Sequence, residues 1–363
     1  MKRIIFFALT SLFLVSCSGN NIAIESTDST ASQKKLEFFG NTQGTTFSVI
    51  CNDDIKITIE EIEELLHNFD LALSSYIPNS IITKLNQAPA GEFVYEDPYN
   101  YFNRCYQLSY LMWSTSNHTF DPTVYSLVDG WGFFNDLENV PDSSVVDSLL
   151  RLVGFQDGYH FTFFTHIDSL GNVIPNNKIL KKTSNAKLDF NGIAQGLAVD
   201  VIAEKLESRG AKNYFVEIGG EIRVKGNNSE GNLWRIGIDK PVENSTAEDR
   251  QIQEVVNIKD KSLATSGSYR RFYEKGGVKY SHTINPKTGY PVQHTLLSAT
   301  VVADNCATAD AMATAFMVMG ADKSIAFLNE HPELGLEVYL IYNNSKGRME
   351  TYYTRNFQDL IVE

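Results

Sequence analysis

Two side chains four residues apart offer the clearest chemistry in this sequence. Asp310 and Thr314 lie in residues 307–315 (ATADAMATA), a run of small residues whose composition favours a helix. Residues at this spacing share one helical face. A carboxylate and a hydroxyl are hard oxygen ligands, which suit Mg²⁺ when phosphate and water complete the coordination. The alternative is an ordinary polar helix face with a solvated Asp310.

A second segment could receive the phosphate groups. Residues 187–196 (KLDFNGIAQG) predict a short strand over 187–190 that ends near Asp189, a turn at Asn191 and Gly192, and a helix over 193–209. A helix N-terminus with small residues binds anions through its free N–H groups, so a diphosphate would fit. The alternative is a simple corner that is capped by Asp189 or Asn191.

A histidine at a strand end could move a proton. His282 lies in residues 281–291 (SHTINPKTGYP), at the end of a predicted strand and beside Asn-Pro and Thr-Gly turns. An imidazole in that place can accept the proton of an attacking hydroxyl, although a structural histidine would fit the same pattern. Residues 119–124 (TFDPTV) predict a helix start, with Asp121 as the N-cap and Pro122 in the first turn.

The elements that must position these groups mix strands with isolated helices. Regular alternation of strand and helix is absent from the pattern, which favours an α+β fold with mainly antiparallel sheets and flanking helices. Strands are predicted over 45–51, 214–218, 221–225, 233–239, 263–268, 278–284, 296–303 and 336–342. Helices are predicted over 57–74, 99–116, 306–319 and 321–329. Residues 156–185 look irregular and are a candidate sub-domain junction.

Composition excludes several classes of protein. The chain has 363 residues, of which 43% are hydrophobic, so it can bury a large core and is not disordered as a whole. The net charge of −13, without a basic stripe, argues against general nucleic-acid binding. The sequence contains no P-loop, no G-x-G-x-x-G after a strand, no G-x-S-x-G and no H-E-x-x-H.

The N-terminus predicts a bacterial lipoprotein. Lys2 and Arg3 precede a short apolar run over 4–15, which is too short for a stable membrane span. Residues 14–17 (LVSC) look like a lipobox, in which the signal is removed before Cys17 and that thiol is lipidated. The alternative is an ordinary signal peptide with a chance cysteine. We therefore expect a signal peptide over 1–16, a flexible polar tether over 17–35 and a single catalytic domain over 36–363.

Three further cysteines carry no visible pattern. Once Cys17 is lipidated, Cys51, Cys105 and Cys306 form an odd set without close spacing. This set is neither a disulfide framework nor a zinc site. We expect each of them to be a small buried hydrophobic side chain.

Taken together and in this order, the motifs resemble the ApbE family, the FAD:protein FMN transferases. The resemblance runs over about residues 39–328, and its ordered motifs are 44–46, 120–124, 189–200, 281–291 and 307–315. It implies that FAD is the flavin donor, that Mg²⁺ is required, and that a Ser or Thr hydroxyl of another protein receives FMN. Two positions depart from the family pattern, because Gln43 replaces the usual Met and Gln195 replaces the frequent Lys. A lost cation at position 195 leaves more of the diphosphate charge to the metal.

The resemblance also implies the roles of individual residues. The expected Mg²⁺ ligands are Asp310, Thr314 and the backbone carbonyl of Gly192, and His282 is the expected catalytic residue, with Asp189 as a possible substitute base. The expected flavin and adenine contacts are Gln43, Tyr76, Thr119, Phe120, Asp121, Asp189, Gln195 and the backbone at Ile284.

The resemblance further implies acceptors among the proteins of membrane redox complexes, and a lipid anchor on the periplasmic side, at the inner membrane. Two other functions use the same residues. In the first, water replaces the acceptor hydroxyl and FAD is hydrolysed to FMN and AMP. In the second, the protein binds FAD without catalysis, but storage would not need a metal on the diphosphate. The identity of the acceptor and the oligomeric state do not follow from the sequence.

Overall fold

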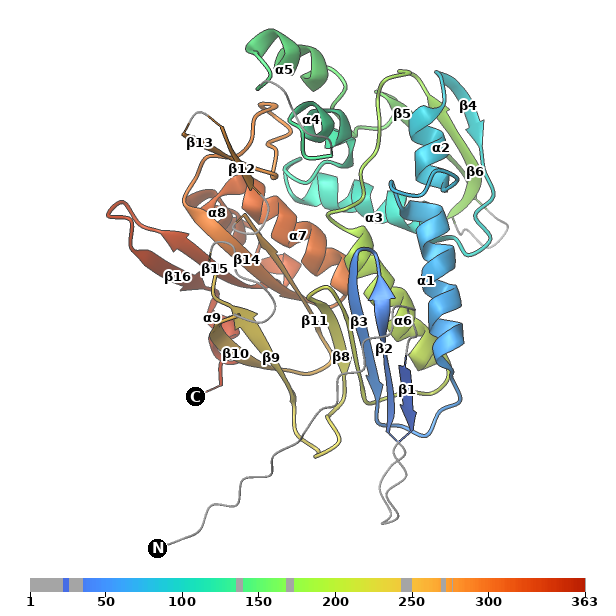
Figure 1. Cartoon of the computed structure of the whole chain (residues 1–363), viewed down its shortest axis with the longest axis vertical. Helices are drawn as coiled ribbons and strands as arrows, with labels where there is room; N and C mark the ends of the chain where they lie inside the picture. The colour runs from blue at the N-terminus through green and yellow to red at the C-terminus, as the bar shows by residue number, and fades with distance from the viewer. Residues whose placement is uncertain are drawn as a thin grey trace, which may run out of the picture.

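A nine-stranded antiparallel sheet forms the centre of the molecule in this computed structural model (Figure 1). The structure describes residues 22–25, 35–134, 140–167, 173–242, 250–268, 272–275 and 277–362. The strand order of the main sheet is β1-β2-β3-β7-β8-β11-β14-β15-β16. Its strands are β1 (Ile22–Glu25), β2 (Leu36–Thr42), β3 (Thr45–Cys51), β7 (Tyr214–Ile218), β8 (Glu221–Lys225), β11 (Ser262–Gly267), β14 (Leu296–Ala303), β15 (Glu337–Asn343) and β16 (Met349–Tyr353).

Helices cover one face of this sheet. The two that lie directly on its strands are α6 (Ala194–Ser208) and α7 (Cys306–Met319). Around them pack α1 (Ile59–Leu73), α2 (Ile81–Gln87), α3 (Tyr101–Thr115) and α8 (Ala321–Glu330), which contact α6, α7 or one another. Helix α7 lies directly on β11 and β14, and α6 packs beside it (Figure 1). The alanines of α7 are almost fully buried, and their small side chains let neighbouring backbone approach closely.

The opposite face of the sheet has a smaller core of its own. Successive strand residues point to opposite faces, so Val338 and Leu340 join the main core whereas Tyr339 and Ile341 face the other way. That second face is covered by the hairpin of β9 (Trp234–Asp239) and β10 (Ile252–Ile258) and by the short helix α9 (Arg355–Gln358). The sheet is therefore buried on both sides over its central strands.

Two smaller sheets and a helical segment complete the fold. Strands β4 (Gly91–Val94), β6 (Val173–Lys181) and β5 (Phe161–Ile167) form one antiparallel sheet, and β12 (Phe272–Lys275) pairs with β13 (Val278–Ser281). A 3₁₀ turn (Pro122–Val124) leads into α4 (Tyr125–Gly130), which packs against α5 (Ser143–Leu150). A second 3₁₀ turn, Pro332–Leu334, precedes β15.

The predicted α+β class and most predicted elements are confirmed. Helix α7 and strands β3, β7, β8 and β14 have the predicted bounds, and the pairings between strands of the main sheet are antiparallel. The 3₁₀ turn at Pro122 has Asp121 as its N-cap, as expected.

Three expectations differ from the structure. Residues 187–190 are not a strand, because Leu188 exchanges hydrogen bonds with the Asn86 side chain and Asp189 N–H donates to the Pro122 carbonyl instead of to a sheet. Residues 156–185 are not irregular throughout, since they contain β5 and β6, whose Phe161 and Ile179 belong to the main core. Within the expected tether, the short, mostly apolar segment Ile22–Glu25 forms β1 and pairs with β2. Cys17 and the signal segment lie outside the described residues, and the expected domain bounds and junction stay predictions.

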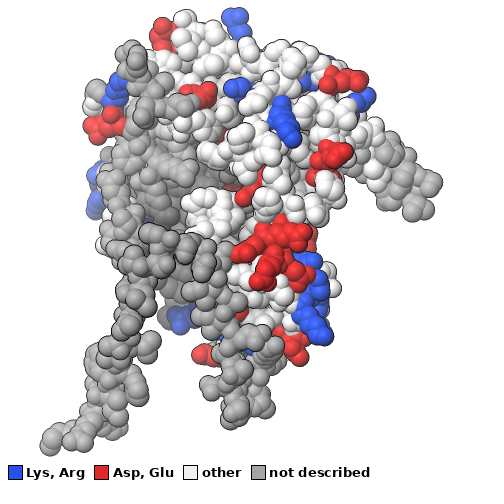
Figure 2. Space-filling view, turned by 45° about the vertical axis from the view of Figure 1, so that its right-hand side comes forward, with Lys and Arg blue, Asp and Glu red and all other residues white. Residues whose placement is uncertain are grey.

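The three remaining cysteines are buried, as expected, and none of them forms a disulfide. None of the helices in the described ranges is both long enough and apolar enough to cross a membrane. Figure 2 shows acidic and basic side chains interspersed over one face of the molecule, with an acidic cluster beside a basic one.

Candidate active site

A cavity of about 730 Å³ opens where α6, α7, β11 and the loops after α3 and β13 meet. It collects side chains from segments that are far apart in the sequence. Eleven of the residues expected from the sequence line it, namely Tyr76, Thr119, Phe120, Asp121, Asp189, Gly192, Gln195, His282, Ile284, Asp310 and Thr314.

Helices α6 and α7 approach each other closely beside this cavity. Gly196 N–H donates to Asp310 Oδ2 at 3.0 Å, and a Cβ on Gly196 would stand only 2.4 Å from the Cys306 carbonyl oxygen. Only a glycine fits there without moving one helix. Burial raises the pKa of Asp310 to about 7, and the hydrogen bond from Gly196 N–H offsets only part of that rise.

Gly192, in the turn before α6, faces Thr314 of α7. A Cβ on Gly192 would lie 3.1 Å from Thr314 Oγ1 and 3.4 Å from the Phe120 ring. Thr314 Oγ1 lies 3.3 Å from Ser266 Oγ of β11, so its hydroxyl faces the cavity wall formed by that strand. The structure thus brings together the three residues that were expected to hold a metal.

The start of α7 is fixed by a buried carboxylate. Asp200 of α6 accepts hydrogen bonds from Cys306 N–H and Ala307 N–H, both at 2.9 Å. Its charge is balanced by Arg223 of β8, whose Nη1 lies 2.7 Å from Asp200 Oδ1. This pairing compensates an otherwise costly buried charge and sets the position of α7, which carries Asp310 and Thr314.

Asp189 lies on a backbone that is fixed from both sides. Asn191 N–H donates to Asp189 Oδ1 at 2.8 Å, and Asp189 N–H donates to the Pro122 carbonyl at 2.7 Å. Burial raises the pKa of Asp189 to about 6, although the bond from Asn191 lowers it. A carboxyl with a pKa close to neutral can exchange a proton, which fits an acid–base role.

Asp121 has a structural function in addition to lining the cavity. Its carboxylate accepts from Thr123 N–H at 2.8 Å and from the Thr123 hydroxyl. The Thr123 hydroxyl oxygen in turn accepts from Gly154 N–H at 2.7 Å. Burial raises the pKa of Asp121 to about 6. These bonds fix the segment that presents Thr119 and Phe120 to the cavity.

His282 follows β13 directly and lines the cavity beside Thr283 and Ile284. Its ring meets Phe133 edge to face, with 6.5 Å between the ring centroids and 73° between the planes. Phe133 and Trp131 belong to a small core around α4 and α5, so the loop that carries His282 rests on a packed support.

Aromatic rings form another wall of the cavity. Tyr76 is 71% exposed and meets Phe134 at 6.5 Å and 78°, and Phe134 stacks on Tyr125 at 4.8 Å. A large ring that remains exposed at a cavity mouth can gain contact area when a flat ligand binds. The wall therefore suits an aromatic ring system.

The charged side chains that line the cavity are all acidic among the described residues. Carboxyl groups of Asp121, Asp189, Glu221 and Asp310 line it, whereas its lining includes no Lys or Arg from the described residues. The charged side chains of the lining therefore offer no counter-charge to a ligand with phosphate groups. Among the described residues, no group of three or more His, Cys, Asp or Glu side chains is arranged to hold a metal.

The structure also places residues that the sequence did not single out. Phe134, Glu221 and Ser266 line the cavity, but nothing in their spacing marks them, because three separate segments supply them. In contrast, Gln43 lies outside the lining. It occupies the β2–β3 turn with φ of 50°. A contact between Gln43 and FAD stays a prediction.

Comparison with solved structures assigns this fold to the flavin transferases. The flavin transferase ApbE of Vibrio cholerae matches with a TM-score of 0.75 and 30% identity, over 90% of this chain and 99% of that one. The apo flavinyl transferase ApbE of Pseudomonas stutzeri matches with a TM-score of 0.74 and 29% identity, over 90% and 96% of the two chains.

Sequence comparison gives the same family. The ApbE family model matches residues 43–340. The FAD:protein FMN transferase of Haemophilus influenzae is 34% identical over 86% of this chain and 88% of its own length. That of Vibrio cholerae is 34% identical over 90% and 93%. The chain belongs to the ApbE family.

Proposed function

We propose that this protein transfers FMN from FAD to a Ser or Thr hydroxyl of an acceptor protein and releases AMP. The single observation that carries the proposal is the cavity in which Asp310, Thr314 and Gly192 meet beside His282 and the Tyr76 wall. The relatives named FAD:protein FMN transferase cover most of the chain and support the same reaction.

The reaction forms one P–O bond and breaks another. The acceptor oxygen attacks the phosphorus of the FMN half of FAD, the P–O bond to AMP breaks, and AMP leaves with the electron pair. The hydroxyl proton passes to a base, for which we propose His282. General base catalysis of this kind is worth roughly 10²- to 10⁴-fold in rate. Asp189, with its pKa near neutral, is the second candidate.

We propose further that Mg²⁺ is the metal of this site. Asp310 would supply a carboxylate oxygen, Thr314 a hydroxyl and Gly192 its carbonyl, which are ligands that Mg²⁺ favours. A bound Mg²⁺ would neutralise diphosphate charge and stabilise the leaving AMP. The acidic lining supports this proposal, because Gln195 brings no positive charge and the diphosphate needs a counter-charge.

Incubation of the protein with FAD, Mg²⁺ and candidate acceptors tests the reaction. We expect a gain of the mass of an FMN phosphoester on the acceptor together with equimolar AMP. Release of free FMN and AMP at the same rate with and without an acceptor would show that the protein is a hydrolase and not a transferase. Binding of FAD without cleavage would leave a storage protein. Full transfer activity in EDTA would contradict the metal proposal.

We propose that the acceptors are subunits of membrane redox complexes, and that Cys17 is lipidated and anchors the enzyme on the periplasmic side of the inner membrane. The lipobox over 14–17 and the polar segment after it support the anchor. Expression of Cys17→Ala tests it, and we expect an uncleaved or soluble form. A variant with unchanged mass and unchanged membrane fractionation would contradict the anchor.

A further inference from the structure

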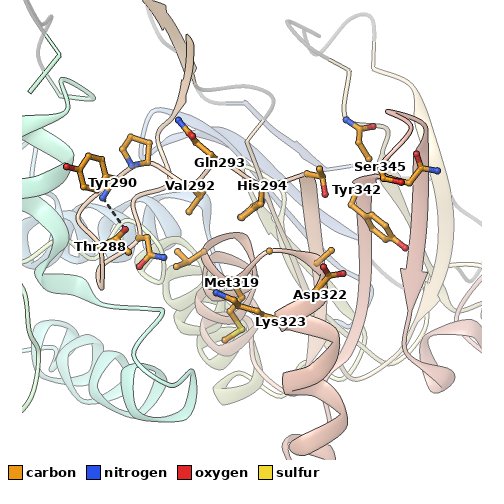
Figure 3. Close-up of a pocket in the computed structure, with 18 residues that line it drawn as sticks. Thr288, Tyr290, Val292, Gln293, His294, Met319, Asp322, Lys323, Tyr342 and Ser345 are labelled. Carbon is orange, nitrogen blue, oxygen red and sulfur yellow. Dashed lines mark hydrogen bonds between the residues drawn. The ribbon is translucent and has the colours of Figure 1, made fainter. Parts of the chain in front are cut away.

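A second cavity, of about 710 Å³, adjoins the active site (Figure 3). Its walls come from the loop before β14, the junction of α7 and α8, and the turn after β15. Figure 3 shows Tyr290, Gln293 and His294 on the loop side, Asp322 and Lys323 on α8, and Tyr342 and Ser345 on the β15 side. We call this cavity the acceptor groove.

The groove begins one helical turn from the expected metal site. Val318 lines both cavities, and it lies four residues after Thr314 on the same face of α7. Four residues of an α-helix span about 6 Å, which an extended peptide covers with two residues. A hydroxyl carried by a segment in the groove could therefore reach the phosphorus beside Thr314.

The groove also meets the active site next to His282. Val292 N–H donates to the Thr283 carbonyl at 3.0 Å, and Ile284 pairs with Pro291. One residue beyond this antiparallel contact, His282 lies on the active-site side and Gln293 on the groove side. The proposed base and the groove are thus neighbours across one narrow hairpin.

The lining of the groove suits an uncharged peptide chain. Gln293 and Thr295 are exposed, and an amide side chain can both donate to and accept from a peptide backbone. Tyr290 is 41% exposed at the rim, where a tyrosine provides contact area. Asp322 and Lys323 contribute one charge of each sign, so the groove does not select a phosphate.

His294 stiffens the wall of the groove instead of serving a ligand. Its Nε2–H donates to the Met317 carbonyl at 2.7 Å, and its Nδ1 accepts from Leu296 N–H at 3.3 Å. Both ring nitrogens are therefore used in the neutral form, and burial lowers the pKa of His294. The ring fixes the end of α7 against the loop, so the groove is preformed.

From this continuity we infer that the acceptor groove binds the extended segment of the acceptor protein that carries the hydroxyl receiving FMN. The inference depends on the transferase function proposed above. In that function FAD occupies the first cavity, so the protein substrate needs a second surface that reaches the same phosphorus. The groove supplies that surface, because it meets the first cavity at Val318 and approaches His282 at Gln293.

The test uses a fifteen-residue peptide with a central Thr, selected from a randomised library for flavin labelling by the wild-type enzyme. Thr295→Arg places bulk in the groove and Gln293→Ala removes an amide. Thr165→Arg, at an exposed threonine of β5 outside both cavities, is the matched control. We expect KM for the peptide to rise about tenfold in Thr295→Arg, or about 1.4 kcal/mol. In Gln293→Ala it should rise several-fold, and the control should match the wild type.

The readouts separate this inference from the proposed function. KM for FAD, and the slow cleavage of FAD by water without a peptide, should stay unchanged in the groove variants. An unchanged peptide KM would overturn the inference, and so would an equal rise in KM for FAD, which would assign the groove to the nucleotide. FAD cleavage by the wild type without labelling of any peptide would also overturn it. Failure of the wild type to cleave FAD would instead contradict the proposed function.

Discussion

The amide nitrogen of Gly196 lies 3.0 Å from Oδ2 of Asp310, which joins the first turn of α6 to the second turn of α7. The contact needs a residue without a side chain, because a Cβ at position 196 would overlap the Cys306 carbonyl. The glycine thus allows a buried carboxylate to lie at the helix–helix contact and still face the cavity.

Substitutions of the two glycines should therefore have different effects. Gly196→Ala must push the helices apart, so we expect a clearly lower melting temperature and loss of Mg²⁺-dependent transfer. In Gly192→Ala the new methyl group only presses on Thr314, at 3.1 Å, so folding should persist while the Mg²⁺ concentration for half-activity rises. Melting curves and Mg²⁺ titrations of both variants decide this. Equal decreases in melting temperature in the two variants would contradict these different roles of Gly196 and Gly192.

Asp310 should make Mg²⁺ binding dependent on pH. Burial raises the pKa of Asp310 to about 7 without metal, whereas an unfolded Asp titrates near 4. The folded protein therefore holds the proton more tightly, and this stabilising contribution is lost as pH rises from about 4 to 7. Mg²⁺ competes with that proton, so its binding should be roughly tenfold weaker at pH 6 than at pH 8.

Two measurements check the Asp310 prediction. In EDTA, the melting temperature of the wild type should fall between pH 5 and 7 more steeply than that of Asp310→Asn, which has no proton to lose there. Calorimetric titration with Mg²⁺ at pH 6 and pH 8 should give the affinity ratio. A pH-independent affinity would show that Asp310 is not a ligand.

The sequence predicted the parts of the fold that have strong local patterns. The alternation in residues 45–51 and the small-residue run in 306–319 gave β3 and α7 with the observed bounds. Residues 187–190 look like a strand, but their hydrogen bonds go to Asn86 and Pro122, which are distant in the sequence. Strand β16 has an exposed pattern without a buried face, so no periodicity marks it.

The site was predictable wherever one segment carries several functional groups, as with Asp310 and Thr314 or with Asp189 and Gly192. Glu221 and Ser266 reach the cavity only because β8 and β11 are neighbours in the sheet. Only three-dimensional contacts could reveal them. The acceptor groove is of the same kind, since its walls come from three segments with no shared motif.

Lys181 should be important for stability. Its side chain is fully buried, and Nζ donates to the carbonyls of Leu85, Asn86 and Ala88 at 2.8 to 3.0 Å. Lys181→Met keeps the volume but leaves three carbonyls without this donor. We expect a loss on the order of 3 kcal/mol in the free energy of unfolding. Chemical denaturation measures it, with the exposed Lys212→Met as the control, and a loss equal to the control would refute it.

Lys181 should also make stability pH-dependent at alkaline pH. Burial lowers the pKa of Lys181 to about 8, below the value near 10.4 of an unfolded Lys. The folded state then gives up its proton first, so stability should rise with pH between about 8 and 10 relative to Lys181→Met. Parallel pH profiles of the two proteins would contradict this lowered pKa.

Tyr76 should contribute to flavin binding through its ring. The side chain is 71% exposed, and its ring lies 6.5 Å from that of Phe134 in a T-shaped pair, so most of the Tyr76 ring remains available to a flat ligand. Tyr76→Ala should weaken FAD binding about tenfold or shift turnover from transfer to hydrolysis, whereas Tyr76→Phe should keep most of the affinity. Fluorescence titration with FAD and the product ratio are the readouts. Native affinity together with a native product ratio in Tyr76→Ala would exclude the contact.

His282 is the residue that we expect to act on the proton of the acceptor hydroxyl. The end of β13 and the hairpin over 283–292 fix its backbone, and Phe133 packs against its ring. His282→Ala should still bind FAD and Mg²⁺, because the expected ligands Asp310, Thr314 and Gly192 are untouched. Single-turnover transfer should fall by roughly two to four orders of magnitude, and the deficit should shrink as pH rises, since hydroxide can partly replace the base.

A purely structural histidine would behave differently. Its removal would lower the melting temperature and the FAD affinity together, with little change in the chemical step. Binding, melting and single-turnover rates measured on His282→Ala therefore separate the two roles. If the single-turnover rate stays near that of the wild type, the proton must go elsewhere, and Asp189 becomes the base to test. Its pKa of about 6 would then predict that transfer by His282→Ala declines below pH 6, where that carboxyl is protonated.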